Sequence, residues 1–78
     1  MLLSARLLAE RLVKEELTRR KWAEEDLAGK LKTDGRKARI ALRLRRESAM
    51  TLAWIAQRLH MGSANTLKNT LQLANSRD

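Results

Sequence analysis

Residues 50–75, MTLAWIAQRLHMGSANTLKNTLQLAN, contain two short amphipathic segments joined by a tight turn. Gly62 can adopt the left-handed backbone conformation that ends a helix, and the Ser63 hydroxyl can cap the helix that follows. We also expect His60 to help terminate the first segment. This order of elements predicts a helix-turn-helix. Apolar residues recur at the spacing of one helical face in both segments, at Leu52, Ile55, Ala56 and Leu59 and then at Leu67, Leu71 and Ala74.

The polar residues of the second segment fall on the side opposite its leucines. Asn65, Asn69 and Gln72 recur at i, i+4 and i+7, which places three amide side chains on one helical face. An amide pairs a donor with an acceptor, as the edge of adenine does in the major groove. A polar face is also what an ordinary solvated helix presents, so the interpretation depends on its position directly after the turn. The residues expected to read bases are Asn65, Thr66, Lys68, Asn69 and Gln72.

The composition of the 78-residue chain favours an all-α fold. The chain has no Pro and three Gly, and residues with high helix propensity dominate it. We therefore predict one domain, a small four-to-five-helix bundle that ends in the helix-turn-helix. A helical part that forms a dimer would cover residues 1–33, and a basic helix followed by the helix-turn-helix would cover residues 36–75.

Charge is distributed unevenly along the chain, whose formal net charge is +8. Residues 1–34 hold eight basic and seven acidic side chains, whereas residues 35–78 hold nine basic and two acidic ones. Such an asymmetry is typical of a protein with a polyanionic partner, because each neutralised phosphate releases condensed counterions. General solubility or incidental RNA affinity would also explain a basic chain.

The N-terminal stretch has no helix breaker and predicts a long helix over roughly residues 3–20. Nine of the first thirteen residues are apolar, so this helix needs cover from two sides. A second copy of the chain can supply one cover, and we predict a homodimer; the alternative is burial within a single-domain core. Charged residues interrupt the apolar run, which argues against a signal peptide. The expected dimer contacts are Leu2, Leu3, Leu7, Leu8, Leu12 and Val13.

The stretch after Lys21 allows two interpretations. Three acidic residues, 24–26, complement the positive end of a helix dipole, and Trp22 has the spacing of a hydrophobic staple with Leu27. A second helix would then begin after Ala23, a residue that caps poorly. Alternatively, the first helix continues to about residue 28. In either case Gly29 closes the segment, and a turn follows at residues 34–35.

A basic helix is predicted from about Arg36 to Glu47, with an inward face of Ile40, Ala41 and Leu44. The helix carries an arginine row, formed by Arg39, Arg43 and Arg46 at i, i+4 and i+7. Arginine binds phosphate in a bidentate manner. The alternative is a solvated basic face that pairs with glutamates of the first helix. Ser48 and Thr51 are alternative caps for the next helix, and we expect Trp54 to fill the core. The residues expected to hold phosphates are Arg36, Lys37, Arg39, Arg43, Arg46 and Ser63.

Several classes of site find no support in the sequence. The chain has one His and no Cys, so we expect no metal site of the usual zinc type. The absence of Cys also fits the reducing cytoplasm, where we expect the protein. No apolar run approaches the ~20 residues of a membrane-spanning helix. With no Gly-rich phosphate loop and no Ser/His/Asp set, we expect no enzymatic activity, cofactor or small-molecule substrate.

The chain contains the runs AERLV (9–13), KEEL (14–17), Trp22, EEDL (24–27), ALRLRRE (41–47), MTL (50–52) and WIAQRLHMGS (54–63). Through these residues, from Ala9 to about Leu73, it resembles the C-terminal segment that follows the catalytic domain in REP-associated tyrosine transposases. The resemblance implies a DNA-binding appendage of a mobile-element protein. That catalytic domain needs a His-hydrophobic-His motif and a nucleophilic Tyr, and this chain has no Tyr, so strand cleavage does not carry over. The base preference does not carry over either, because Ala64 and Asn65 differ from the family pattern.

Together these features predict a cytoplasmic, homodimeric protein that binds double-stranded DNA, as a regulator or as a remnant of a transposon protein. The last helix would read the major groove. The main alternative is a non-catalytic interaction module, in which the apolar N-terminal helix and the arginine row bind an acidic helical partner. RNA is a weaker alternative, because the absence of Phe and Tyr leaves few residues on which bases can stack.

Overall fold

The computed structural model describes residues 2–32 and 34–76, with side chains described for residues 5–32 and 34–73. These residues form helices and no strands, which confirms the predicted small all-α bundle. The bundle has five helices within the described ranges: α1 (Leu2–Arg20), α2 (Glu24–Gly29), α3 (Gly35–Glu47), α4 (Leu52–Arg58) and α5 (Ala64–Ser76).

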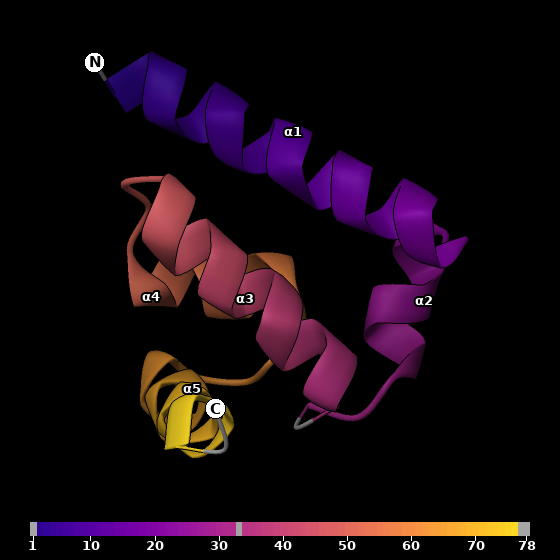
Figure 1. Cartoon of the computed structure of the whole chain (residues 1–78), viewed down its shortest axis with the longest axis vertical. Coiled ribbons are helices and arrows are strands. Elements are labelled where there is room, and N and C mark those ends of the chain that lie inside the picture. Colours follow the sequence, from indigo (N-terminus) through magenta and orange to yellow (C-terminus); the bar gives the residue numbers. More distant parts are fainter. Residues whose placement is uncertain (1, 33, 77–78) are drawn as a thin grey trace.

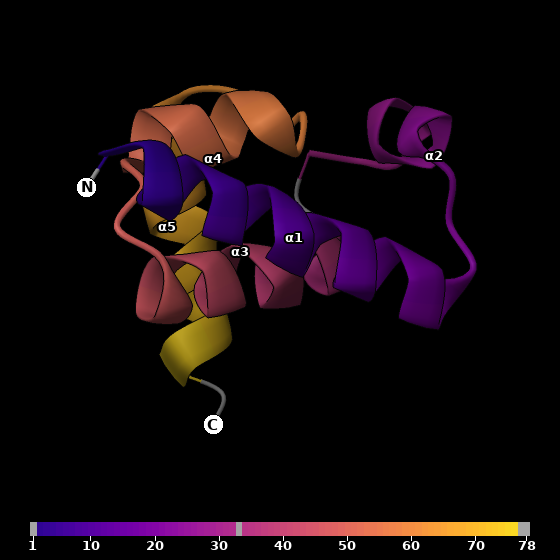
Figure 2. The same cartoon turned by 90° about the horizontal axis from the view of Figure 1, so that it is seen from above.

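Helix α3 occupies the centre of the bundle and packs against α1, α4 and α5. Helices α1 and α5 lie on opposite sides of it (Figure 1). The predicted inward face of α3 is confirmed, because Ile40, Ala41 and Leu44 are buried. Seen from above, the C-terminal end of α5 extends past α3 (Figure 2). One end of α5 is therefore anchored in the bundle and the other projects from it.

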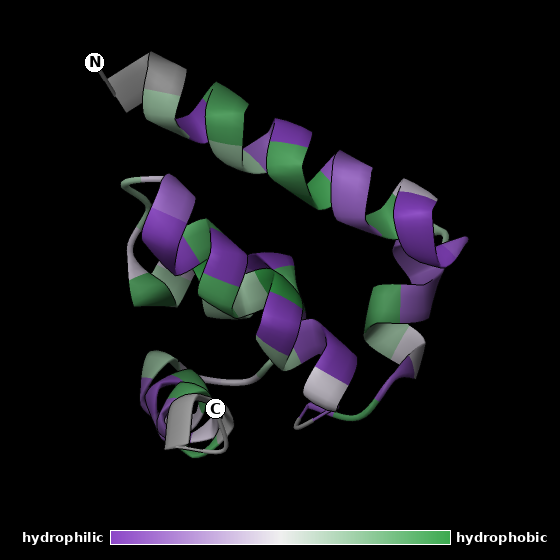
Figure 3. Ribbon diagram, in the orientation of Figure 1, coloured by the Kyte–Doolittle hydropathy of each residue, from purple (hydrophilic) through white to green (hydrophobic). Residues whose placement is uncertain are grey.

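The apolar core draws on all five helices and on the turn between α4 and α5. In α1 the buried residues follow the i, i+3, i+4 spacing that turns one face toward α3. Leu27 of α2 is also buried, and Trp22 and Trp54 pack partly buried against the core, as predicted for Trp54. Figure 3 shows apolar residues interspersed with polar ones along every helix, as expected where each helix buries only part of its circumference.

Two of the predicted dimer contacts belong instead to the core of a single chain. Leu12 and Val13 are buried against the rest of the protein, because they lie on the α1 face that α3 covers. Leu7 and Leu8, by contrast, are 64% and 39% exposed. The side chains of Leu2 and Leu3 lie outside the described residues. Among the described side chains of α1, Leu7 and Leu8 are therefore the large apolar residues that remain exposed.

The first helix ends at Arg20, so the interpretation with a separate second helix is correct. Lys21 takes a left-handed conformation (φ 59°), and the Trp22 amide donates to the Leu17 carbonyl at 2.9 Å. These features form a Schellman motif, which halts the helix without a glycine. Ala23 has no side-chain oxygen to cap α2, but the Asp26 carboxylate accepts a hydrogen bond from the Ala23 amide at 2.6 Å.

Polar side chains set the ends of α3 and α4. The Asp34 carboxylate accepts from the Arg36 amide at 2.8 Å and so caps the start of α3. Of the two candidate caps for α4, the structure uses Thr51, whose hydroxyl accepts from the Trp54 amide at 3.1 Å. Ser48 instead closes α3 by donating its hydroxyl to the Leu44 carbonyl at 2.7 Å. These caps fix where the helix-turn-helix begins.

Candidate nucleic-acid interface

Helix α4 is terminated by a histidine rather than by the glycine two residues later. His60 adopts a left-handed conformation (φ 55°), and the Met61 amide donates to the Ala56 carbonyl at 2.8 Å. This is the hydrogen bond of a Schellman motif, and Met61 is fully buried beneath it. The predicted role of His60 in ending α4 is thus confirmed. Gly62 also has a positive φ of 84°, and there it redirects the chain into α5.

Ser63 caps α5, as the sequence predicted. Its hydroxyl accepts from the Thr66 amide at 3.2 Å and lies 3.1 Å from the Thr66 hydroxyl. Leu67 and Leu71 are buried, which orients α5 around its long axis. The cap and the two leucines together decide which residues of α5 face outward.

The outward face of α5 carries most of the predicted base-reading residues. Asn65, Lys68, Asn69 and Gln72 are all exposed, and they lie opposite the buried leucines. Thr66 is half-buried beside Ser63, at the edge of this face rather than on it. We call Asn65, Lys68, Asn69 and Gln72 the amide face. An exposed helical face of this kind presents donors and acceptors to a groove of duplex DNA.

One predicted phosphate contact, Lys37, is fully buried, and that prediction is wrong. Its ammonium donates to the Lys30 carbonyl at 3.2 Å and to the His60 carbonyl at 2.9 Å. Burial lowers the pKa of this ammonium below its ordinary value of 10.5. The sequence held the necessary signal, since residues 37, 40, 41 and 44 share one helical face. Lys37 therefore fastens the turn before α5 to the segment that follows α2.

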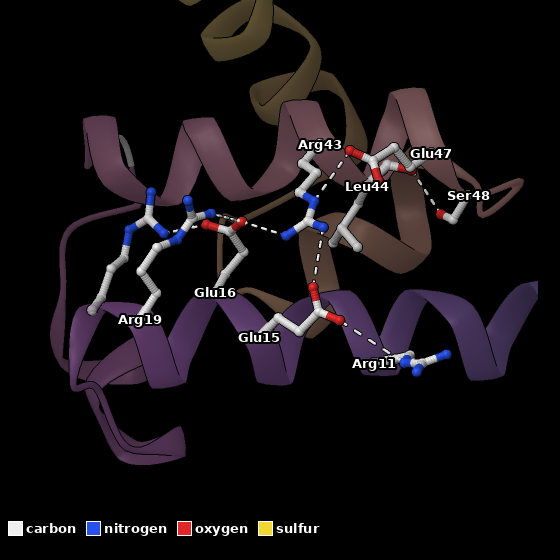
Figure 4. Close-up of polar contacts among 9 residues, drawn as sticks. Arg11, Glu15, Glu16, Arg19, Arg43, Leu44, Glu47 and Ser48 are labelled. Atoms are coloured by element: carbon white, nitrogen blue, oxygen red, sulfur yellow. Dashed lines mark hydrogen bonds and ion pairs between the residues drawn. The ribbon is translucent and has the colours of Figure 1, made fainter.

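Arg43, a second predicted phosphate contact, is directed toward α1 (Figure 4). Its guanidinium donates to Glu16 at 2.7 Å and to Glu15 and Glu47 at 3.1 Å each. These carboxylates raise the pKa of Arg43, with Glu16 the main cause. The arrangement matches the alternative interpretation, pairing with glutamates of the first helix. Arg43 thus joins α3 to α1 and is a corrected prediction.

Glu16 is the buried carboxylate at the centre of this network. Burial alone would raise the pKa of Glu16, but hydrogen bonds from Arg43, Arg20 and Arg19 outweigh burial and lower it. A buried charge is tolerated only where it is paired and hydrogen-bonded, and Glu16 has three such partners. The network therefore neutralises Arg43, which the sequence predicted to bind a phosphate.

The remaining arginines of α3 differ in their availability. Arg39 and Arg46 are exposed, and neither forms an ion pair with another residue in the described part of the chain. Arg36 is bound to the Asp34 carboxylate at 2.9 Å, and its guanidinium carbon lies 5.0 Å from the centre of the Trp22 ring. The Arg36 side chain lowers the pKa of Asp34 to about 2. Arg39 and Arg46 are the better candidates for binding phosphate.

Arg58 was not singled out in the sequence, yet it joins three helices. Its guanidinium donates to both oxygens of Glu24 in α2 at 2.9 Å, and its Nε donates to Glu10 in α1 at 3.1 Å. The bidentate pair is the stronger geometry for an arginine and a carboxylate. Arg58 thereby holds α4, the first helix of the helix-turn-helix, against the N-terminal part of the chain.

Acidic side chains are concentrated in the first two helices, whereas basic side chains occur on α1 as well as on α3 and α5. Six of the nine acidic residues belong to α1 and α2, and four of them, Glu10, Glu15, Glu16 and Glu24, pair with arginines. The exposed cations away from α1 and α2 include Lys32, Arg39, Arg46 and Lys68. Cations without a carboxylate partner among the described residues are therefore found on α3, on α5 and in the segment before α3.

The described residues offer few other kinds of site. Within residues 2–32 and 34–76, no three His, Cys, Asp or Glu side chains lie together in a way that could hold a metal ion. None of the described helices is both long enough and apolar enough to cross a membrane. A shallow depression between α1 and α3 is lined by Glu15, Arg19 and Arg43, which are already paired with one another or with Glu16.

Comparisons with known proteins assign no family to the chain. No protein-family model matches it, and neither curated proteins nor solved structures gave a significant match. The functional argument therefore depends on the geometry of the amide face and its surroundings.

Proposed function

We propose that this protein binds double-stranded DNA and reads the major groove with α5. The observation that carries the proposal is the amide face: three amides and one lysine, exposed together on a helix whose other side is buried. Asn and Gln match adenine in the major groove, and Lys68 can contact guanine or a phosphate. The helix follows a capped turn and projects from the bundle, as a recognition helix must if it is to enter a groove.

Phosphate contacts in this proposal come from cations that no neighbouring carboxylate neutralises. Arg39 and Arg46 lie exposed on α3, the helix against which α5 packs. Arg36 and Ser63 take a smaller share, because Arg36 is paired with Asp34 and Ser63 caps α5. Contacts of this kind position a protein on DNA without reading its sequence.

The biological setting we propose is that of a cytoplasmic regulator or a remnant of a transposon protein. The support is the similarity of residues 9–73 to the segment that follows the catalytic domain in REP-associated tyrosine transposases. In those proteins that segment is an appendage, so DNA binding without strand cleavage is the role proposed for this chain.

We also propose that the protein forms a homodimer through the outward face of α1. Leu7 and Leu8 are the exposed large apolar residues of that helix among those described. Because α1 and α5 lie on opposite sides of α3, pairing through α1 would leave both copies of α5 open. Two reading helices in one dimer would bind a site with two related halves.

A selection from random duplex DNA, followed by fluorescence anisotropy on the selected site, tests DNA readout. Replacing Asn69 by Ala should reduce the preference for the selected site over a scrambled duplex by about 1–3 kcal/mol. Replacing Arg46 by Gln should weaken binding to both duplexes and lower the salt slope by about one. If both variants lost affinity equally on both duplexes, Asn69 would not read bases. If the wild type bound no duplex even at low salt, an acidic protein partner would be the better hypothesis.

A further inference from the structure

We infer that Lys32, in the segment between α2 and α3, contacts a DNA phosphate beside the start of α5, in addition to the phosphate contacts proposed above. This inference rests on the proposed function and extends it to a residue outside both the helix-turn-helix and the arginine row. The partner is the sugar-phosphate backbone that borders the groove in which α5 would lie.

The first step is the position of the Lys32 side chain. Its Cδ atom lies 3.5 Å from the point that a Cβ atom on Gly62 would occupy, so the stem of Lys32 packs against the turn. Gly62 is the residue before the cap of α5, and the nearby Thr66 atoms belong to the first turn of that helix. A residue thirty positions earlier in the sequence is thus brought to the beginning of α5.

The second step is how firmly this segment is held. The buried Lys37 ammonium binds the Lys30 carbonyl on one side and the His60 carbonyl on the other. One group therefore fixes the segment after α2 and the turn before α5 to each other. Lys30 lies two residues before Lys32, so this link to the turn is close to Lys32 along the chain.

The third step distinguishes Lys32 from its basic neighbours. The Lys30 ammonium lies 5.0 Å from the centre of the Trp22 ring, a cation–π contact, and Arg36 is bound to Asp34. Lys32 is exposed and makes no ion pair with any residue in the described ranges. Its charge is therefore the one in this segment that remains available to a partner.

The fourth step identifies the partner as a nucleic-acid backbone. The connection between α2 and α3 lies on the same side of the bundle as α5, away from α1 (Figure 1). The phosphate strands border the major groove on both sides of a helix docked in it. A lysine beside the start of that helix can neutralise one phosphate, and as a flexible point charge it needs no bidentate geometry.

The test compares Lys32→Gln with Lys14→Gln, a matched change at an exposed lysine of α1 on the opposite side of the bundle. Binding of each variant to the selected duplex and to a scrambled one is followed by fluorescence anisotropy at four salt concentrations. We expect Lys32→Gln to reduce the slope of log K against log salt by about 0.9 on both duplexes, since one phosphate contact is lost. Lys14→Gln should leave the slope unchanged, and Lys32→Arg should restore it.

The outcomes separate this inference from the proposal on which it rests. If the wild type binds the selected duplex and the two glutamine variants have equal slopes, Lys32 makes no phosphate contact and the proposed function stands. If the wild type binds no duplex at any salt concentration, the proposed function and this inference fall together. A loss of sequence preference in Lys32→Gln would also overturn the inference, because a phosphate contact carries no base information.

Discussion

Lys37 shows how a single buried cation can organise a small helical protein. Its two acceptors are backbone carbonyls from segments far apart in the sequence, and it has no carboxylate hydrogen-bond partner among the described residues. An amine donates N–H groups in both its charged and its neutral form, so Lys37 can satisfy both carbonyls in either state. Burial disfavours the charged form, which explains why the pKa of Lys37 is lowered.

Replacing Lys37 by Met should destabilise the fold by about 1–3 kcal/mol at neutral pH, because two carbonyls lose their donor. The difference between wild type and variant should grow as pH rises toward 10.5. In that range the unfolded chain binds the Lys37 proton more tightly than the folded chain, so the wild type gains stability with pH. Urea unfolding of both proteins at several pH values measures the difference. A constant difference across that range would contradict the argument.

At the scale of single residues, the arginines divide into two classes. Arg43 and Arg58 are paired with carboxylates of α1 and α2, and we expect them to act in stability. Arg39 and Arg46 lack such partners within the described residues and remain available for the proposed phosphate contacts. In a helix, Arg43 differs in direction from Arg39 by about 40°. That small rotation is enough to turn one arginine toward α1 and leave the other exposed.

At the scale of the element, the helix ends have a common design. Helices α1 and α4 both stop at a non-glycine residue with positive φ, Lys21 and His60. A left-handed conformation costs such a residue roughly 1–2 kcal/mol relative to glycine's freedom. The apolar residues that follow them, the fully buried Met61 and the partly buried Trp22, offset that cost.

Replacing His60 by Gly should therefore stabilise the protein by about 1 kcal/mol, since the strain at φ 55° is relieved. The His60 side chain is exposed, and its carbonyl remains to accept from Lys37. Thermal unfolding followed by circular dichroism measures the change. As a control, Gln57→Gly inside α4 should destabilise by about 1 kcal/mol. A destabilised His60→Gly variant would show that the imidazole itself has a stabilising contact.

The elements could be predicted from the sequence to a large extent, because their signals are local. Periodic leucines and the cap at Ser63 were sufficient for the helix-turn-helix, and the bounds of α1 and α3 were close to those observed. The end of α4 was harder to predict, because Gly62 was the expected left-handed residue, whereas His60 is the residue that ends the helix. The cap of α2 was harder to recognise in the sequence, because the Asp26 side chain supplies it in place of Ala23.

The candidate site could be predicted only in part, because its composition depends on contacts between distant segments. The outward direction of Asn65 and Asn69 followed from the leucine spacing alone. The pairing of Arg43 with Glu16 was foreseen only as one of two alternatives, since spacing does not show which helix lies alongside. The approach of Lys32 to Gly62 has no local signal, because thirty residues separate them.

At the scale of the whole molecule, the two proposed surfaces lie on opposite sides of α3. Helix α1 presents Leu7 and Leu8 together with most of the paired acids, and α5 presents the amide face with Lys68. This arrangement would allow the two proposed partners, a second copy of the chain and a nucleic acid, to be bound at once. The two surfaces should therefore be separable by mutation.

The double variant Leu7→Glu, Leu8→Glu should have the mass of one chain in light scattering, where the wild type should have twice that mass. Placing two carboxylates on the outward face of α1 would set like charges against each other in the dimer. Leu73→Glu is the matched control, because Leu73 is 70% exposed on α5 and lies away from the proposed contact. Equal masses for the wild type and the double variant would exclude pairing through these leucines.

The central claim is that the outward face of α5 is the surface that binds DNA. The most direct measurement is an NMR titration of the isotope-labelled protein with the selected duplex, following every backbone amide. We expect the largest chemical-shift changes at Asn65, Lys68, Asn69 and Gln72, with smaller ones near Lys32, and little change along the outward face of α1. Shifts confined to Leu7, Leu8 and their neighbours, with α5 unaffected, would contradict the account.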